Sequence, residues 1–432
     1  MIRWCVAFAA ALGASAVLAA RDRAALPSSV PDDEFWTMTE EFSEPNGFFN
    51  SDNLLSNETT FQYPIPRLVA AIKPGMAYLG VGPEQNFTYI IALQPGIAFI
   101  PDIRRGNLQE HLLYKALIEM AADRAEFLSL LFSRARPAGL GPATAVGPLL
   151  DAYMQAAPSD ALYQKNFAAV KSWLIAHHGF KLRAEDVNGI DYIYSSFQAG
   201  GPLLSYNAAR PQRQRYPTYS ELQRETDGQG QPRGYLASEA NFRWLKRFEE
   251  LNLIIPIVGD FGGSKALKAV AGYLKDHGAT VGAFYTSNVE NYLFQDGIWA
   301  QFARNAAALP LDASSTFIRA CFDSCAAVAP AGSRAVTLLD SMTSLLADVE
   351  RGPVPVAISE YVAGHDLELH TFAGAEAQVA ALSDEKLVWP VIPEISATHD
   401  TQPSITLDSP ADCPLYIGRL LAGVNVKAPT PG

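Results

Sequence analysis

Two glycines followed by an acid form the pattern with the clearest chemical meaning in this chain. In residues 76–104, MAYLGVGPEQNFTYIIALQPGIAFIPDIR, an apolar run, a glycine turn, a helical stretch and a second apolar run follow one another. Gly80 and Gly82 stand where the first strand turns into the helix, and Asp102 ends the second strand. In doubly wound folds an acid at this place binds the hydroxyls of a ribose. The segment therefore predicts a nucleotide-type cofactor site.

Charges near the turn indicate which cofactor fits. Glu84 lies at the start of the expected helix, where free backbone amides would otherwise bind a pyrophosphate, and its carboxylate repels phosphate. It would instead accept the ammonium of S-adenosylmethionine, while Asp102 takes the ribose. Arg104 and Arg105 favour the alternative of a ribose phosphate in an NADP-type site. A dinucleotide turn would carry a third glycine where this chain has Gln85, so we favour S-adenosylmethionine.

A second unit with the same organisation spans residues 252–290. It predicts a strand, a helix and a strand, with Asp260 after the first strand and Asn288 after the second. We expect these two residues at the carboxyl ends of neighbouring strands, where open α/β sheets bind ligands. Methyl transfer would need a base or a positioning group, and Asp260 and Tyr285 are the candidates. The structural alternative is that the glycines and Asp102 only shape a turn.

The elements that must position these residues form a predicted α/β domain. Residues 106–136 keep a helical period and predict one helix, residues 148–200 are mostly helical, and residues 210–234 form a long polar loop. Short extended pieces follow residue 330. We predict a linker or arm at 20–45, a Rossmann-like, methyltransferase-like doubly wound sheet at 46–330, and a small β-rich segment at 331–432.

Composition and the first residues suggest a compartment. The chain has 432 residues, 49% hydrophobic, with a net charge of −12, which argues against a nucleic-acid partner because a duplex requires a basic face. Residues 1–19 combine Arg3 with an apolar run that ends in small residues, which predicts a secretory signal peptide. The protein would then be exported, periplasmic or secreted, with no stable membrane span after cleavage. An uncleaved anchor is the alternative.

Cysteines and histidines carry weaker signals. Cleavage would leave three cysteines, an odd number, and we expect buried thiols or one disulfide. No Cys-x-x-Cys pair is present, and the His/Asp pairs near the C-terminus match no metal motif, so no metal is expected. The cysteines are Cys321, Cys325 and Cys413, and the histidine and acid residues are His365, Asp366, His370, His399 and Asp400.

Several longer blocks carry a resemblance. EPNGFFNSDNLLSNE, YLGVGPEQNFTYI, FIPDIRRGN, HLLYKAL, IVGDFGG and FYTSNVENYLF occur in this order, as in a family of uncharacterised bacterial proteins, over about residues 35–325. Through the glycine turn and its acid, this family is remotely similar to class I S-adenosylmethionine-dependent methyltransferases. The resemblance implies that the cofactor pocket is lined by Gly80, Gly82, Gln85 and Asn86, with Asn53 and Glu58 closing over it.

The sequence thus predicts an exported α/β protein with a pocket for a small molecule of the S-adenosylmethionine type. Two other functions stay open. One is a non-catalytic extracytoplasmic binding or surface protein that retains the fold, and the other is an NADP-type oxidoreductase. Export and an S-adenosylmethionine pocket conflict, because that cofactor is a cytoplasmic metabolite.

Overall fold

A computed structural model describes most of the chain. The described residues are 25–207, 216–322, 329–330 and 333–351, together with three short strands farther on. The predicted signal peptide, Cys325, Cys413 and the His/Asp pairs near the C-terminus lie outside them. In this part of the chain, no helix is long and apolar enough to cross a membrane.

The core of the described fold is one mostly parallel sheet of seven strands in the order β3-β2-β1-β4-β5-β6-β7. β1 to β5 run parallel, and β6 and β7 are antiparallel to their neighbours. A separate parallel pair is formed by β8 and β9. The strands are β1 (Ala77–Gly80), β2 (Ile97–Asp102), β3 (Ile254–Val258), β4 (Val281–Ser287), β5 (Thr316–Cys321), β6 (Val336–Ser341), β7 (Glu368–Leu369), β8 (Ser404–Thr406) and β9 (Asn425–Lys427).

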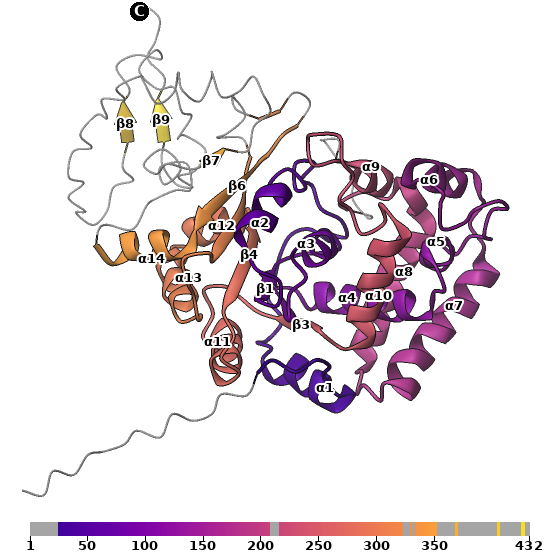
Figure 1. The fold of residues 1–432 in the computed structure, drawn as a ribbon, viewed down its shortest axis with the longest axis horizontal. Coiled ribbons are helices and arrows are strands. Elements are labelled where there is room, and N and C mark those ends of the chain that lie inside the picture. Colours follow the sequence, from indigo (N-terminus) through magenta and orange to yellow (C-terminus); the bar gives the residue numbers. More distant parts are fainter. Residues whose placement is uncertain are drawn as a thin grey trace, which may run out of the picture.

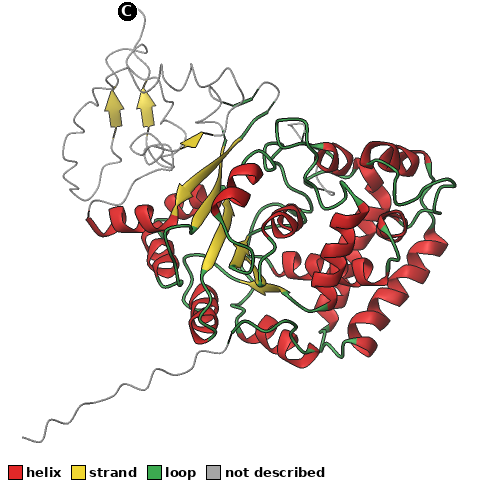
Figure 2. Cartoon of the chain, viewed as in Figure 1, coloured by secondary structure: helices red, strands yellow, loops and turns green. Residues whose placement is uncertain are grey.

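Helices lie on both sides of the sheet. Figure 1 shows α11, α13 and α14 on one side and α3, α4 and α10 on the other, and Figure 2 shows the large helical layer beyond α4. The helices are α1 (Asp32–Glu41), α2 (Ile65–Ala71), α3 (Gln85–Leu93), α4 (Arg105–Met120), α5 (Arg124–Phe132), α6 (Val146–Gln155), α7 (Asp160–Ser172), η1 (Trp173–His177), α8 (Ala184–Gly200), η2 (Gly201–Leu203), α9 (Tyr219–Arg224), α10 (Glu239–Glu250), α11 (Ala266–Asp276), α12 (Val289–Gln295), α13 (Trp299–Ala307) and α14 (Met342–Arg351).

The central strands confirm the α/β class. Every residue of β1, β2 and β3 is buried, as expected for parallel strands covered on both faces. The predicted strand, turn, helix and strand of residues 76–104 are β1, α3 and β2, and the second predicted unit is β3, α11 and β4. β2 and β3 are added on one side of β1, and β4, β5 and β6 are added on the other side. The order in which successive strands join the sheet therefore reverses at β1.

Four features differ from the sequence expectation. The single helix predicted over 106–136 is two helices, because the Asp123 side chain accepts the Glu126 amide at 2.8 Å and starts a new one. The predicted arm contains α1, which buries Phe35 and Met38. The polar loop contains α9, whose capping box joins Thr218 and Glu221. β6 pairs with β5, so the sheet continues past the predicted boundary at residue 330.

Candidate functional site

The turn after β1 requires both of its glycines. Gly82 has a φ of +82°, in the left-handed region that side chains disfavour. Gly80 has ordinary backbone angles but no room, because a Cβ there would overlap Asn86 Oδ1 and lie 2.6 Å from Tyr78 Oη. The turn therefore needs glycine at position 82 for its backbone conformation and glycine at position 80 for lack of space.

Asn86 holds this turn together from inside. Its side-chain amide donates to the carbonyl oxygens of Val81 at 3.0 Å, Gly82 at 3.0 Å and Pro83 at 2.9 Å, and its Oδ1 accepts from the Tyr78 hydroxyl at 2.8 Å. Asn86 is fully buried and does not line the neighbouring cavity. Its role in the structure is to fix the turn.

A cavity of about 390 Å³ opens at the carboxyl ends of the central strands. This volume falls in the range of small-molecule sites. Parts of the chain that are far apart in the sequence line it: residues 48–58, the glycine turn, the ends of β2 to β4, and α12. Of the predicted site residues, the lining includes Asn53, Glu58, Gly82, Gln85, Asp102, Asp260 and Tyr285, but not Gly80, Glu84 or Asn86.

Asp102 lies at the end of β2 as predicted, and an arginine neutralises it. Its Oδ1 accepts the Arg104 amide at 2.9 Å, and its Oδ2 is 3.1 Å from Arg104 Nη2. Arg104 also donates to the carbonyl of Asp52. Arg105 is not part of the cavity lining, because it pairs with Asp186 at 2.6 Å and Glu40 at 2.9 Å. Neither arginine is left free for a phosphate.

Glu58 is the most unusual acid of the cavity. Its side chain is fully buried, its Oε1 accepts the hydroxyls of Tyr285 at 2.8 Å and Ser287, and its Oε2 has no partner. No salt bridge to Glu58 is found among the described residues. Burial raises the pKa of Glu58 to about 7, although both hydroxyl donors act in the opposite direction.

Two further cavity residues present an unpaired oxygen. Gln85 donates from Nε2 to the Val81 carbonyl at 3.3 Å and to Tyr285 Oη at 3.4 Å, but its Oε1 has no partner. Asn53 Oδ1 is also buried and unpaired, on a residue with a φ of +48°. Since buried oxygens without donors are costly, these atoms favour a ligand that supplies hydrogen-bond donors.

A second set of unpaired acids lies behind the turn rather than in the cavity lining. Glu84 precedes α3, and Glu110 and His111 project from α4; each is at most 2% exposed. Burial raises the pKa of Glu84 to about 8 and that of Glu110 well above its usual range, and the charge of Glu84 adds to the effect on Glu110. Burial lowers the pKa of His111 to about 4, and its Nε2 lies 2.9 Å from the Gly82 carbonyl oxygen. Sequence reasoning missed Glu110 and His111, because a helical period does not distinguish them from surface residues.

The two catalytic candidates, Asp260 and Tyr285, both line the cavity, but their side chains differ in how far they are occupied by hydrogen bonds within the protein. Asp260 Oδ1 accepts the Gly262 amide at 2.8 Å, and burial raises the pKa of this half-buried acid. The Tyr285 hydroxyl is committed to Glu58, and burial raises its pKa well above its usual range. The expectation that Asp260 and Asn288 follow neighbouring strands was wrong: β2 and β1 lie between β3 and β4, because the crossover spans the sheet.

Aromatic side chains at the edge of the cavity were not predicted as site residues. Phe48 is 85% exposed, the most exposed large hydrophobic side chain among the described residues. The rings of Phe49 and Tyr292 meet edge to face with centroids 5.1 Å apart. Phe48 and Phe49 follow a turn-rich stretch and Tyr292 lies on α12, more than 200 positions away, so only the folded structure brings them together.

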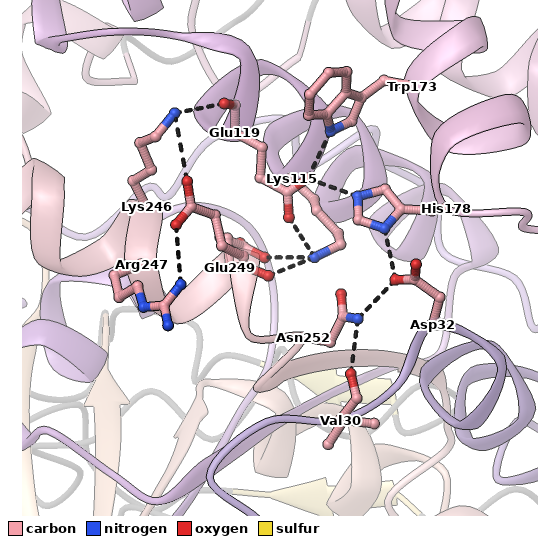
Figure 3. Close-up of polar contacts among 11 residues, drawn as sticks. Val30, Asp32, Lys115, Glu119, Trp173, His178, Lys246, Arg247, Glu249 and Asn252 are labelled. Carbon is pink, nitrogen blue, oxygen red and sulfur yellow. Dashed lines mark hydrogen bonds and ion pairs between the residues drawn. The ribbon is translucent and has the colours of Figure 1, made fainter.

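Charged residues on α1, α4 and α10, together with His178 just after η1, form a separate, mostly buried network, drawn in Figure 3. Lys115 Nζ lies 2.7 Å from Glu119 and 3.9 Å from Glu249. His178 bridges Glu119 at 2.6 Å and Asp32 at 2.7 Å, and thereby ties α1 to the helical layer. Since all of its charges are paired and none lines the cavity, this network is a structural device rather than a site.

The described residues contain no group of three or more His, Cys, Asp or Glu side chains that could hold a metal ion. Cys321, at the end of β5, is disulfide-bonded.

The fold is of the mixed α/β class, with a cavity at the carboxyl edge of a mostly parallel sheet. The chain belongs to the family described as Domain of unknown function (DUF7790), whose model matches residues 54–141 and 144–348.

Short matches connect the chain with a second kind of protein. It is 45% identical over 58 residues to the phenylalanine–tRNA ligase beta subunit of Dechloromonas aromatica, and 38% identical over 61 residues to that of Pseudomonas putida. These matches cover 13% and 14% of this chain and only 7% and 8% of those subunits. They therefore show that one short segment of this chain is similar to a short segment of those subunits.

Proposed function

We propose that the cavity binds S-adenosylmethionine or its demethylated product, and that the fold is Rossmann-like, of the methyltransferase type. The strand order supports this proposal. The chain reverses direction at β1, and open α/β sheets bind ligands outside the carboxyl ends of the strands at such a reversal. The cavity occupies this place.

The observation that carries the proposal is the set of unpaired oxygens on residues that line the cavity. Asn53 Oδ1, Glu58 Oε2 and Gln85 Oε1 are all acceptors. S-adenosylmethionine offers an ammonium, ribose hydroxyls and an adenine amino group, all of which donate. Asp102 would take the ribose hydroxyls, Asn53 and Gln85 would take the ammonium, and Glu58 would close over the site. When bound, the cofactor would supply an electrophilic methyl group.

Glu84, which the sequence favoured as the acceptor of the ammonium, is not part of the cavity lining. It is buried behind the turn, beside Glu110. The acceptor role therefore passes to the cavity oxygens. An NADP-type ligand is disfavoured, because Arg104 is paired with Asp102 and Arg105 with Glu40 and Asp186.

Calorimetry tests the proposal. S-adenosylmethionine, S-adenosylhomocysteine and NADPH would be titrated into the full chain and into Asp102→Asn, with Asp276→Asn on the exposed end of α11 as a matched control. We expect heat with the first two ligands only. Loss of a charged hydrogen bond should weaken binding in Asp102→Asn by about 10-fold to 100-fold, since such bonds contribute roughly 1.5–3 kcal/mol. Absence of heat with both sulfur ligands would refute the proposal.

We also propose that the protein is exported, on the strength of the signal-like residues 1–19. Export would separate the site from the cytoplasmic supply of its cofactor, which favours a non-catalytic binding protein as the second candidate. The mass of the mature chain tests export directly. A full-length mass in the exporting cell would count against it.

A further inference from the structure

We infer that Glu58 is the proton acceptor of the cavity. It acts on the hydroxyl of a planar phenol that binds against the aromatic edge, formed by the side chains of Phe48, Phe49 and Tyr292. This inference rests on the proposed function, because the methyl group must come from the sulfonium cofactor. It gives Glu58 a catalytic role instead of a purely cofactor-binding one.

Glu58 is suited to this role by its contacts. One oxygen is fixed by the hydroxyls of Tyr285 and Ser287, and the other is buried without a protein partner, on a residue that lines the cavity. The carboxylate is therefore held in one orientation, with a free oxygen for an incoming proton. Its pKa of about 7 places it near neutral pH, where a general base is most effective.

The other titratable groups facing the cavity are less suitable. Tyr285 donates its own proton to Glu58, and Asp102 is neutralised by Arg104 at 3.1 Å. Asp260 is half-buried and already accepts the Gly262 amide. Asp296 also lines the cavity, and its charge adds to the raised pKa of Asp260. Only Glu58 combines full burial with an unpaired oxygen among the acids that line the cavity.

The chemical class of the second substrate follows from the base and the aromatic edge. Phe48, Phe49 and Tyr292 line the same cavity as Glu58, and aromatic rings of this kind pack well against a planar molecule. A phenol has a pKa near 10, about three units above that of Glu58, so its proton can be removed during the reaction. An aliphatic alcohol is far less acidic, and a neutral amine attacks without prior loss of a proton.

Methyl transfer to the phenol forms one carbon–oxygen bond and breaks one carbon–sulfur bond. The phenol oxygen forms a bond to the methyl carbon, and its proton passes to Glu58 Oε2. The carbon–sulfur bond breaks, and its electron pair stays on the sulfur, which thereby loses its positive charge. The products are a methyl ether, a neutral thioether and a protonated Glu58.

Methyl transfer from labelled S-adenosylmethionine to one-ring and two-ring phenols tests the inference, with cyclohexanol as the non-aromatic comparison. In the full chain, kcat/KM should rise with pH through an apparent pKa near 7. Glu58→Gln should lower kcat by about 100-fold to 10,000-fold and flatten the profile. Tyr285→Phe removes one donor to Glu58 and should shift the profile to higher pH.

Glu225→Gln is the matched control. Burial also raises the pKa of Glu225 to about 7, but Glu225 does not line the cavity, so its removal should leave the profile unchanged. Binding of S-adenosylhomocysteine without transfer to any phenol, or transfer that Glu58→Gln leaves intact, would overturn the inference. Absence of binding would instead refute the proposed function. Carbon NMR titration of Glu58 gives an independent result, because an ordinary pKa near 4.5 would overturn its role as base.

Discussion

Removal of the Glu119 charge should destabilise the fold by an amount that the structure allows us to calculate. Lys115, His178 and the Trp173 indole nitrogen all contact the Glu119 carboxylate, at 2.7, 2.6 and 2.6 Å. The contacts with His178 and Lys115 lower its pKa from 4.5 to about 2, in spite of the opposing effect of burial. At roughly 1.4 kcal/mol per pKa unit, ionised Glu119 contributes about 3 kcal/mol. We therefore expect Glu119→Gln to lower the free energy of unfolding by about 3 kcal/mol at pH 7.

The sign of the pH dependence follows from the lowered pKa. The contribution of Glu119 is fully present above its unfolded pKa of 4.5 and is lost as the pH falls through about 2. The difference between the full chain and Glu119→Gln should shrink to about 2 kcal/mol at pH 3.5. His178 behaves in the opposite way: its pKa is raised, so its contribution is present below its usual value and is lost at higher pH.

Urea denaturation followed by far-ultraviolet circular dichroism measures these differences, since it does not depend on the Trp173 environment. Glu250→Gln is the control, because Glu250 is 37% exposed and its ion pairs with Lys246 and Arg247 are 3.7 and 3.5 Å long. That change should cost under about 0.5 kcal/mol. A loss below about 1 kcal/mol for Glu119→Gln at pH 7, or a loss independent of pH, would refute the reasoning.

Three further changes test the turn and the sheet. Gly82→Ala forces a side chain into the left-handed region, 3.1 Å from Gln85 Nε2, and should cost about 1–2 kcal/mol in thermal unfolding; an unchanged melting temperature would contradict the geometry. Asn86→Ala removes the donor to three carbonyls of the turn and should lower the free energy of unfolding by about 2–4 kcal/mol. Ligand binding measured by calorimetry should weaken as well, and normal binding would show that the turn does not depend on Asn86. Glu290→Gln removes the carboxylate that lies 2.7 Å from the fully buried Arg319, and it should lower the free energy of unfolding in denaturant by about 3–5 kcal/mol. A loss under about 1 kcal/mol would mean that Asp340, 3.1 Å away, is enough to neutralise Arg319.

The local order of elements was predictable because it depends on neighbouring residues. The apolar runs of β1 and β2, the glycines between them and the terminal Asp102 stand close together in the sequence, and each has the predicted place. The α/β class and the second unit of β3, α11 and β4 are confirmed for the same reason. The split between α4 and α5 was missed because one capping side chain, Asp123, outweighs the continuing helical period.

The site depended on contacts that no local pattern reveals. Glu58 and its two hydroxyl donors are separated by more than 200 positions in the chain. Glu84 and Asn86 stand beside lining residues in the sequence, yet the helical turn directs them away from the cavity lining. Such differences arise because successive residues at the start of a helix point in different directions.

A crystal structure of the protein grown with S-adenosylhomocysteine tests the central claim most directly. We predict ligand density in the cavity at the carboxyl ends of β1, β2 and β4, with the ribose at Asp102 and Glu58 Oε2 still free of protein partners. A saturated crystal with an empty cavity, or with the ligand bound elsewhere, would contradict the account.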